Sequence, residues 1–407
     1  MSNTLLTPTK IIREALRITH QRANFVTTLE NKYENEFGVS GAKIGDTCQV
    51  RLPNKWKSTA SATLNVQDVT EAKVDVTVDT RRHIGMAFPT KDLTLTIDDF
   101  SKRYIDPAVS QIMADVEYDT IAKLYKGVYN RVEPGTATAA LTLSVMGDAR
   151  RKLVDNLAPR GSTWYANLMP RQTSDIVADG KALFHASAEI QKQYKEGIVG
   201  TAAGFDFYEN TLWPRHVQGA GNTAYTVDTR TSAMPITEPN TPISSFTVAS
   251  GSGIALKGDI FTIANVYRVH PESRVSTGEL QQFVLTADTV SGAGTWSFSP
   301  SIRTAGPNQN VTIPSTSATA AIDIVTASKN YDNSLAYHPQ FAAFVAPPLD
   351  LPGTDFEARE TMDGISMRIV SQYDITNDRK VTRLDIQYGS ALLRPEWAVR
   401  IKSRQDP

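Results

Sequence analysis

The chain has 407 residues, with 42 basic and 43 acidic side chains and a formal net charge of −1. This balance excludes a global attraction to nucleic acid or anionic lipid, so any such contact would have to be local. Glycine and proline occur at ordinary frequency, which excludes collagen-like and low-complexity chains. The single cysteine, Cys48, excludes intrachain disulfides and cysteine-based zinc sites. No apolar run reaches the roughly 18 residues of a membrane span, so we expect a soluble protein made in a reducing cytoplasm.

The first predicted element is a helical arm from Pro8 to about Glu36. Apolar side chains recur there at helical spacing, and charged side chains occupy the opposite face. Ile12 and Leu16 belong to this apolar stripe. The stripe needs an apolar partner, which is either the chain's own body or a neighbouring molecule.

A projecting hairpin is predicted between Gly41 and Pro89, where the hydrophobic period changes to two. Apolar and polar residues alternate on both sides of a polar stretch at 53–62. Trp56 lies in that stretch between Lys55 and Lys57 and has no evident partner in its own chain. This position favours a contact with another molecule.

A long helix, bent at Pro107, is predicted over 98–129, because apolar residues recur at helical spacing after possible N-caps. A mixed region follows. We expect a helix at 144–156, a strand at 162–168 and a proline-started helix at 170–182.

The composition changes at about Gly219. Residues 219–322 hold only five basic and six acidic residues, and short β-branched runs alternate with turn residues. Strands are expected at 246–249, 259–269, 280–286, 295–298 and 310–313. This pattern predicts a small β-barrel or sandwich inserted into an α+β host. Further strands are expected in the host at 365–373, 383–388 and 398–401.

Residues that could carry chemistry form no convincing motif. The run from Gly219 to Ala224 matches a dinucleotide-binding pattern by letters, but it lacks the required strand and helix, so we interpret it as a connector. The six histidines are far apart and form no zinc motif. Asp98 and Asp99 fit a helix cap better than an acid–base pair. We predict no catalytic, cofactor-binding or metal-binding residue, and no enzyme.

The densest basic cluster is Arg81-Arg82-His83. Its ordinary interpretation is a solvated strand end. The alternative is a contact with another subunit or with nucleic-acid phosphates.

Five segments occur in an order and at a spacing that point to one family. They are Arg103–Val109, Leu183–Ile190, Gly200–Asn210, Leu256–Tyr267 and Tyr388–Trp397. Together they resemble the major capsid proteins of tailed bacteriophages with the Hong Kong 97 fold, and within them the phage P22 type, which carries an inserted domain. The resemblance covers essentially the whole chain.

The resemblance implies an α+β, Hong Kong 97-like capsid fold with an inserted all-β barrel domain. The implied parts are an N-terminal arm (1–38), an extended loop and peripheral domain with the spine helix (39–135), an axial domain in two pieces (136–218 and 327–360), the inserted barrel (219–326) and a C-terminal return to the peripheral domain (361–407).

The resemblance also implies a function. The chain would self-assemble, as pentamers and hexamers, into the icosahedral head shell that encloses a double-stranded DNA genome. Implied partners are a scaffolding protein, a portal protein, packaged DNA bound without sequence preference and, as an option, a decoration protein, with no membrane. Assembly would take place in the host bacterial cytoplasm, and the product would be the virion. The inter-subunit contact candidates are Ile12, Leu16, Lys55, Trp56, Lys57, Arg81 and Arg82. On this basis we expect Ile12→Asp with Leu16→Asp to block assembly and leave a folded monomer.

An alternative function remains open from the sequence. The serine- and threonine-rich β domain also fits a carbohydrate-binding adhesin or tail component. The long helix and the terminal arm do not support that alternative.

Overall fold

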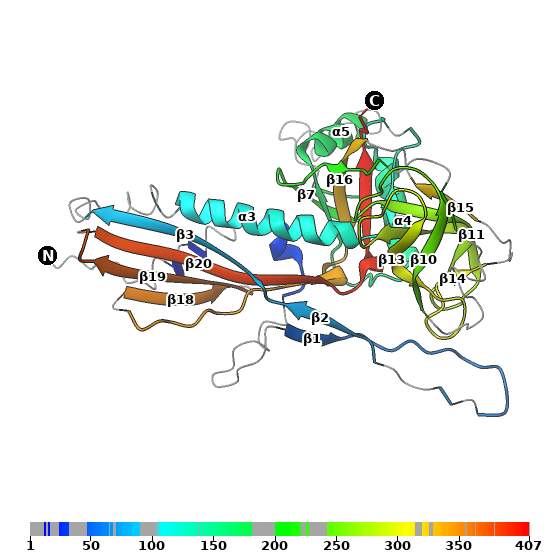
Figure 1. The fold of residues 1–407 in the computed structure, drawn as a ribbon, viewed down its shortest axis with the longest axis horizontal. Coiled ribbons are helices and arrows are strands. Elements are labelled where there is room, and N and C mark those ends of the chain that lie inside the picture. The colour runs from blue at the N-terminus through cyan, green and yellow to red at the C-terminus, as the bar shows by residue number, and fades with distance from the viewer. Residues whose placement is uncertain are drawn as a thin grey trace. The chain divides into compact units, whose positions relative to one another are not determined.

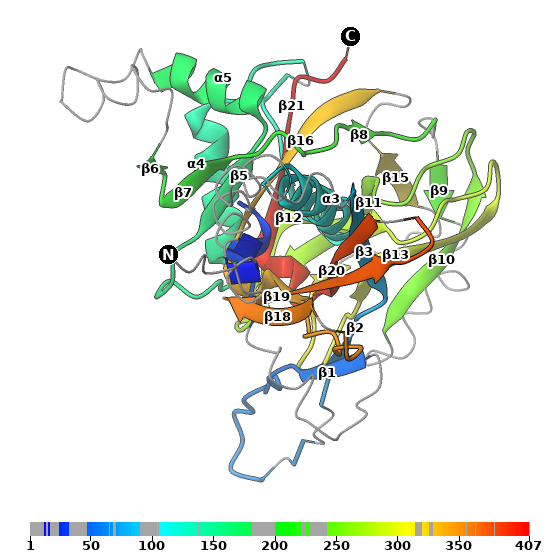
Figure 2. The ribbon, with the colours of Figure 1, turned by 90° about the vertical axis from the view of Figure 1, so that its left-hand side faces the viewer.

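The computed structural model divides the chain into two compact units, each assembled from separate segments (Figures 1 and 2). Unit 1 comprises 1–51, 73–121 and 342–393, and unit 2 comprises 52–72, 122–341 and 394–407. The structure describes residues 12–13, 15–16, 24–31, 47–64, 66–67, 71–89, 104, 106–136, 138–180, 200–220, 225–227, 242–313, 320–324, 329–354, 356–362, 364–377 and 379–406.

Unit 1 is built around an antiparallel sheet in the order β17-β20-β19-β18, with β3 also pairing along β20. The strands are β3 (Thr80–Pro89), β17 (Ala342–Val345), β18 (Phe356–Met362), β19 (Ile365–Asp374) and β20 (Arg379–Leu392). Alternate residues of a strand share a face, and one face of this sheet is apolar and buried. Its members include Met367, Ile369, Leu384 and Ile386.

Helix α3 (Asp106–Leu124) runs along this sheet (Figure 1). Its Asp119 carboxylate accepts hydrogen bonds from Arg82 and Tyr388, which belong to the apolar face. The helix buries an apolar stripe at helical spacing, composed of Val109, Ile112, Met113 and Val116. A short 3-10 helix, η1 (Val26–Thr28), is joined to the same unit because Glu30 and Ala343 form a β-bridge.

The predicted hairpin is present in unit 1. Strands β1 (Thr47–Arg51) and β2 (Lys73–Thr77) pair antiparallel, with Cys48 opposite Val76 and Val50 opposite Val74. Their inward residues pack with Ala343, Val345 and Leu393. The alternation seen in the sequence therefore reflects a half-buried ribbon, and the thiol of Cys48 is buried.

Unit 2 contains a mixed sheet in the order β4-β21-β16-β5-β7-β6, with β8 also pairing with β16. The strands are β4 (Arg131–Val132), β5 (Tyr165–Leu168), β6 (Thr201–Ala202), β7 (Phe205–Glu209), β8 (His216–Val217), β16 (Asn330–Tyr337) and β21 (Ala398–Ser403). Three short 3-10 helices, η5 (Tyr125–Gly127), η6 (Pro339–Phe341) and η7 (Pro395–Trp397), also belong to this unit. Helices α4 (Leu143–Asp155) and α5 (Pro170–Gly180) accompany the sheet, close to their predicted bounds.

The inserted domain of unit 2 is a closed barrel. Its strands follow the order β12-β13-β10-β9-β15-β11, and β11 pairs back with β12. The strands are β9 (Tyr225–Val227), β10 (Ile243–Ser250), β11 (Ile260–Val269), β12 (Ser276–Leu285), β13 (Gly294–Ile302) and β15 (Ala320–Ile324), with β14 (Val311–Thr312) beside β11. Aromatic side chains fill its core, and they are Tyr225, Phe246, Phe261, Phe283, Trp296 and Phe298. Closure removes the exposed sheet edges that an open arrangement would leave.

Several predicted bounds differ from the structure. The helix expected over 98–129 ends at Leu124, and η5 follows it before Val128 becomes extended. Gly127 explains this early end, because glycine is a poor helix former. Residues 98–103 and the segment Leu183–Ile190 lie outside the described residues.

Two parts of the chain lie in other sheets than the resemblance implied. Strands β17 and β18, within or beside the segment 327–360, join β19 and β20 in unit 1. Strand β21, within 361–407, instead pairs with β16 and β4 in unit 2. All six residues of β21 are buried, so both faces of this strand are covered in the sheet of unit 2.

Candidate inter-subunit contact surfaces

The loop between β1 and β2 exposes large apolar side chains. Trp56 is 58% exposed, Leu64 is 86% exposed and Val66 is 78% exposed. Lys55 and Lys57 beside Trp56 are exposed as well. Several exposed apolar side chains on one segment are typical of a surface that binds another molecule.

The main chain of this loop is held within unit 2. Arg274 Nη2 donates a hydrogen bond of 2.8 Å to the carbonyl oxygen of Trp56. The same guanidinium also donates to the carbonyl oxygens of Glu272 and Pro307. The expectation that Trp56 lacks an intrachain partner is therefore wrong for its main chain, whereas its indole stays largely exposed. Farther along the loop, Gln67 exchanges hydrogen bonds with the main chain of Lys57.

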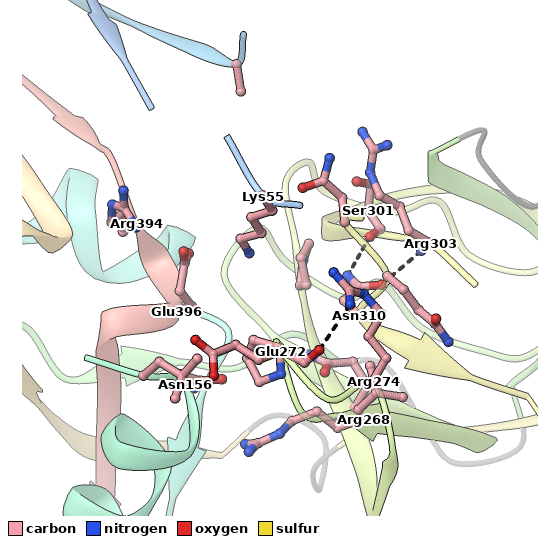
Figure 3. Close-up of a pocket in the computed structure, with 18 of the residues that line it drawn as sticks. Lys55, Asn156, Arg268, Glu272, Arg274, Ser301, Arg303, Asn310, Arg394 and Glu396 are labelled. Carbon is pink, nitrogen blue, oxygen red and sulfur yellow. Dashed lines mark hydrogen bonds between the residues drawn. The ribbon is translucent and has the colours of Figure 1, made fainter. Parts of the chain in front are cut away.

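A cavity of about 800 Å³ lies beside this anchor point, within unit 2 (Figure 3). The loop contributes Lys55 and Trp56 to its lining. The inserted domain contributes three arginines, Arg268, Arg274 and Arg303. Other charged residues of the lining are Glu272, Arg394 and Glu396. Asn310 fixes one wall by bonding the amide of Arg303 and the carbonyl oxygen of Ser301.

The described apolar side chains of the N-terminal arm are buried by the chain itself. Ile12 and Leu16 lie in helical residues and are at most 1% exposed. These two side chains therefore contribute to the subunit's own fold. We now expect Ile12→Asp with Leu16→Asp to unfold unit 1, since an unpaired buried carboxylate costs several kcal/mol, and circular dichroism of the variant tests this.

The basic cluster on β3 is paired within unit 1. Arg82 donates to Asp119 at 2.5 and 3.0 Å, and these hydrogen bonds raise the pKa of its guanidinium above the ordinary value. Arg81 forms an ion pair of 3.1 Å with Asp385. The side chains of both arginines are still more than 40% exposed, so intrachain pairing leaves part of each guanidinium accessible. The cluster is therefore a paired strand end and not a set of free charges.

Asp385 is fully buried and receives further arginines. Arg368 and Arg383 donate to its two oxygens, each at 2.5 Å. Burial opposes ionisation of this carboxyl, but the hydrogen bonds from Arg368, Arg383 and Arg81 outweigh it and hold the pKa of Asp385 below its ordinary value. Sequence reasoning missed Asp385, Asp119 and Arg274. For Asp385, the run Arg383-Leu-Asp385 was an available signal, because alternate residues of a predicted strand lie on the same face.

A buried polar cluster joins the barrel to the sheet of unit 2. Asp259 is 1% exposed and accepts hydrogen bonds from His216 Nε2 (2.8 Å), Gly219 N (3.0 Å) and Leu256 N (2.9 Å). Burial lowers the pKa of His216 below its ordinary value of 6.5, so this imidazole is neutral at pH 7. The neutral ring donates from Nε2 to Asp259, which leaves Nδ1 to accept from the hydroxyl of Tyr125 at 3.4 Å.

The described residues offer no other site of obvious chemistry. Within them, no group of three histidine, cysteine, aspartate or glutamate side chains could hold a metal ion. No helix in the described ranges is long and apolar enough to cross a membrane. The geometry therefore presents contact surfaces and structural polar clusters.

Comparison with known proteins identifies the family. The model described as "P22 coat protein - gene protein 5" matches residues 41–401. A search of curated proteins found no match. Solved structures similar to this chain include one of Mycobacterium phage Che8, with 10% identity, 93% of this chain and 90% of that chain covered, and a TM-score of 0.48.

Two further solved structures are similar at the same distant level. The capsid of Cyanophage P-SCSP1u has 12% identity, with 88% of this chain and 84% of that chain covered and a TM-score of 0.44. The mature capsid of bacteriophage PhiM1 has 11% identity, with 89% and 83% covered and a TM-score of 0.41. The family match, and not these distant likenesses, replaces the carbohydrate-binding alternative. Because that match spans most of the sequence, the chain belongs to the P22 coat protein family and is a major capsid protein that self-assembles into the head shell of a virion.

Proposed function

We propose that this capsid protein encloses the double-stranded DNA genome of a tailed bacteriophage in an icosahedral shell of pentamers and hexamers. Assembly takes place in the host bacterial cytoplasm, guided by a scaffolding protein, with a portal protein at one vertex. A decoration protein is an optional external partner, and DNA is held without sequence preference. The subunit acts structurally and catalyses no reaction. The match to the coat protein family over 41–401 is the observation that carries this proposal.

The loop at 52–72 is the proposed contact with a neighbouring subunit. Its Trp56, Leu64 and Val66 are exposed in the isolated chain, and their burial against a second copy would remove apolar surface from water. Lys55 and Lys57 add local positive charge beside the indole. Apolar side chains flanked by charges are typical of the centre and rim of a protein interface.

The inserted barrel (219–326) is proposed to aid folding of the subunit and to contribute contacts between capsomers. Its own closed sheet and aromatic core support an autonomous folding unit. We expect residues 219–326 expressed alone to unfold cooperatively, and a featureless melt would argue against this role. The arm (1–38), the peripheral segments (39–135 and 361–407) and the axial segments (136–218 and 327–360) are proposed as domains of the capsid fold, except that β17 and β18 belong with the sheet of unit 1 and β21 with that of unit 2.

The decisive experiment is the particle size of the purified protein, with and without a co-expressed scaffolding protein from the same source. Light scattering followed by negative-stain microscopy should show closed shells hundreds of ångströms across. A persistent monomer or small oligomer under both conditions would contradict the proposal. Shells formed only with the scaffolding protein would support its role as an assembly partner.

A further inference from the structure

A row of charged side chains crosses one face of the unit 1 sheet. Arg359 on β18 lies opposite Arg368 on β19, Arg368 lies opposite Asp385 on β20, and Asp385 lies opposite His83 on β3. Directly paired residues of neighbouring strands project from the same face, so these four side chains share one surface. It is the face opposite the one that carries the apolar core under α3.

Two more arginines lie on this face, two residues from the row. Arg383 precedes Asp385 by two positions on β20, and Arg81 precedes His83 by two positions on β3. We call Arg81, Arg359, Arg368 and Arg383 the arginine face. Figure 1 shows the four strands β18, β19, β20 and β3 that carry it.

The arginine face has more positive charge than its own carboxylates neutralise. Three of the guanidiniums pair with the buried Asp385, but its single negative charge neutralises only one of their three positive charges. Arg359 donates to the carbonyl oxygen of Leu349 and pairs with the exposed carboxylate of Asp350 at 4.0 Å, and such an exposed pair is weak. Glu357, on the same face, accepts hydrogen bonds from the amides of Gly353 and Thr354. Even with Asp350 and Glu357 counted, the balance of the face stays positive.

The geometry of the face also favours an additional anion. Arg359 and Arg368 are like charges directly across two strands, an arrangement that destabilises a sheet. The Arg368 side chain is only 13% exposed, and its Nε is buried without a hydrogen-bond partner. Asp385 holds the guanidiniums in place, so an incoming carboxylate would meet donors that are already oriented.

The rest of the same chain supplies the complementary charge. The whole chain carries −1, and the arginine face together with Asp385 carries +3, so the remainder carries −4. In a shell made of identical copies, each neighbour carries four more carboxylates than basic side chains outside the arginine face and Asp385. We propose that the arginine face docks a carboxylate-bearing segment of a second copy of this chain. This proposal rests on the self-assembly of the protein as a capsid.

The test uses charge reversal at the two most exposed arginines of the face. The side chains of Arg359 and Arg383 are 46% and 43% exposed, and the buried Asp385 keeps its pairs with Arg81 and Arg368 when Arg383 is replaced, so Arg359→Glu with Arg383→Glu should fold. Arg171→Glu with Lys257→Glu changes the net charge equally on exposed positions of unit 2 and is the matched control. Circular dichroism verifies folding, and Arg359→Glu alone provides a milder variant if the double variant is unstable.

Shell formation is measured by light scattering and sedimentation against protein concentration. The double variant on the arginine face should need at least a tenfold higher concentration to assemble, and the control should assemble like the wild type. Raising salt from about 0.1 to about 1 M should weaken wild-type assembly more than that of the variant, because the screening length falls from about 10 to about 3 Å.

Equal assembly of the double variant, the control and the wild type would overturn the proposal. Normal assembly of the double variant with less nucleic acid in its shells would also overturn it, because the face would then bind phosphates. A wild-type protein that forms no shell under any condition would refute the capsid function itself. If the wild type forms shells and the double variant assembles at the same protein concentration, only the contact at the arginine face is refuted.

Discussion

Removal of the Asp259 carboxylate should loosen the junction between the inserted barrel and the sheet of unit 2. Its two oxygens accept three hydrogen bonds, from His216 and from the amides of Gly219 and Leu256, and water cannot reach them in the folded chain. In Asp259→Ala all three donors lose their acceptor. A buried donor without a partner costs about 1–3 kcal/mol, so we expect a loss of about 3–5 kcal/mol after local relaxation.

Asp259→Asn should cost much less. The amide oxygen of asparagine can accept from both backbone N–H groups, as one carboxylate oxygen does now. The amide nitrogen would then face His216, which can change tautomer so that Nε2 accepts and Nδ1 donates to Tyr125. The asparagine variant also avoids the cost of burying a charge, so we expect a loss of about 1 kcal/mol.

Native-state hydrogen exchange is the suitable assay, because a chain with two units does not guarantee a single two-state transition. The amides of Gly219 and Leu256 report directly on the junction. Their protection should fall by two to three powers of ten in the alanine variant, at about 1.4 kcal/mol per power of ten, and by about one in the asparagine variant. Equal losses in both variants, or a loss under about 1 kcal/mol for alanine, would refute the reasoning.

Three further predictions concern stability. Burial lowers the pKa of His216, so as the pH falls the unfolded chain binds a proton at this imidazole before the folded chain does. The urea concentration at the midpoint of unfolding should therefore decrease as the pH falls below about 6.5. The variant His216→Gln should lack this dependence. Phe261→Ala, in the aromatic core of the barrel, should cost about 3–5 kcal/mol in chemical denaturation, whereas exposed Val290→Ala should change stability by less than about 0.5 kcal/mol. In Gly389→Ala the new Cβ would lie 2.1 Å from a carbonyl oxygen of the β1–β2 hairpin. This clash should lower the melting temperature and reduce the free energy of unfolding by about 1–3 kcal/mol. The control Gly85→Ala, whose Cβ would have no atom within 4 Å, should leave the stability unchanged.

Local pattern was enough to predict much of the fold. Helices α4 and α5 lie within a few residues of their predicted bounds, because amphipathic spacing and Pro170 mark them in the sequence. The long barrel strands β10 to β13 were recognisable from β-branched runs between turns. Strands β9 and β15 were missed, since three residues of β9 and the alanine-rich start of β15 have little strand signal, although both are needed to close the barrel.

Long-range pairing was beyond the sequence. Arg81 meets Asp385 across 304 residues and Arg82 meets Asp119 across 37, so no local spacing could reveal that the basic cluster is paired. The arm had the same ambiguity: its stripe required an apolar partner, and only the fold shows that Ile12 is buried by its own chain. Trp56 was the informative exception, because its polar surroundings already indicated an exposed side chain.

The apolar side chains of the arm are buried within the subunit, whereas those of the loop at 52–72 are exposed and can bind a neighbouring subunit. Burial of Trp56, Leu64 and Val66 on a neighbour would contribute roughly 1.5–3 kcal/mol for each side chain. The three together would supply about 4.5–9 kcal/mol, whereas association of two proteins costs about 4–15 kcal/mol in lost freedom of motion, so one loop contact alone gives at most weak binding. A second contact made by the same pair, such as the proposed one at the arginine face, largely avoids that cost because the two copies are already together. Each further contact that a subunit makes inside a shell adds to its stability, so a closed shell, in which every subunit makes all of its contacts, is favoured over an open pair.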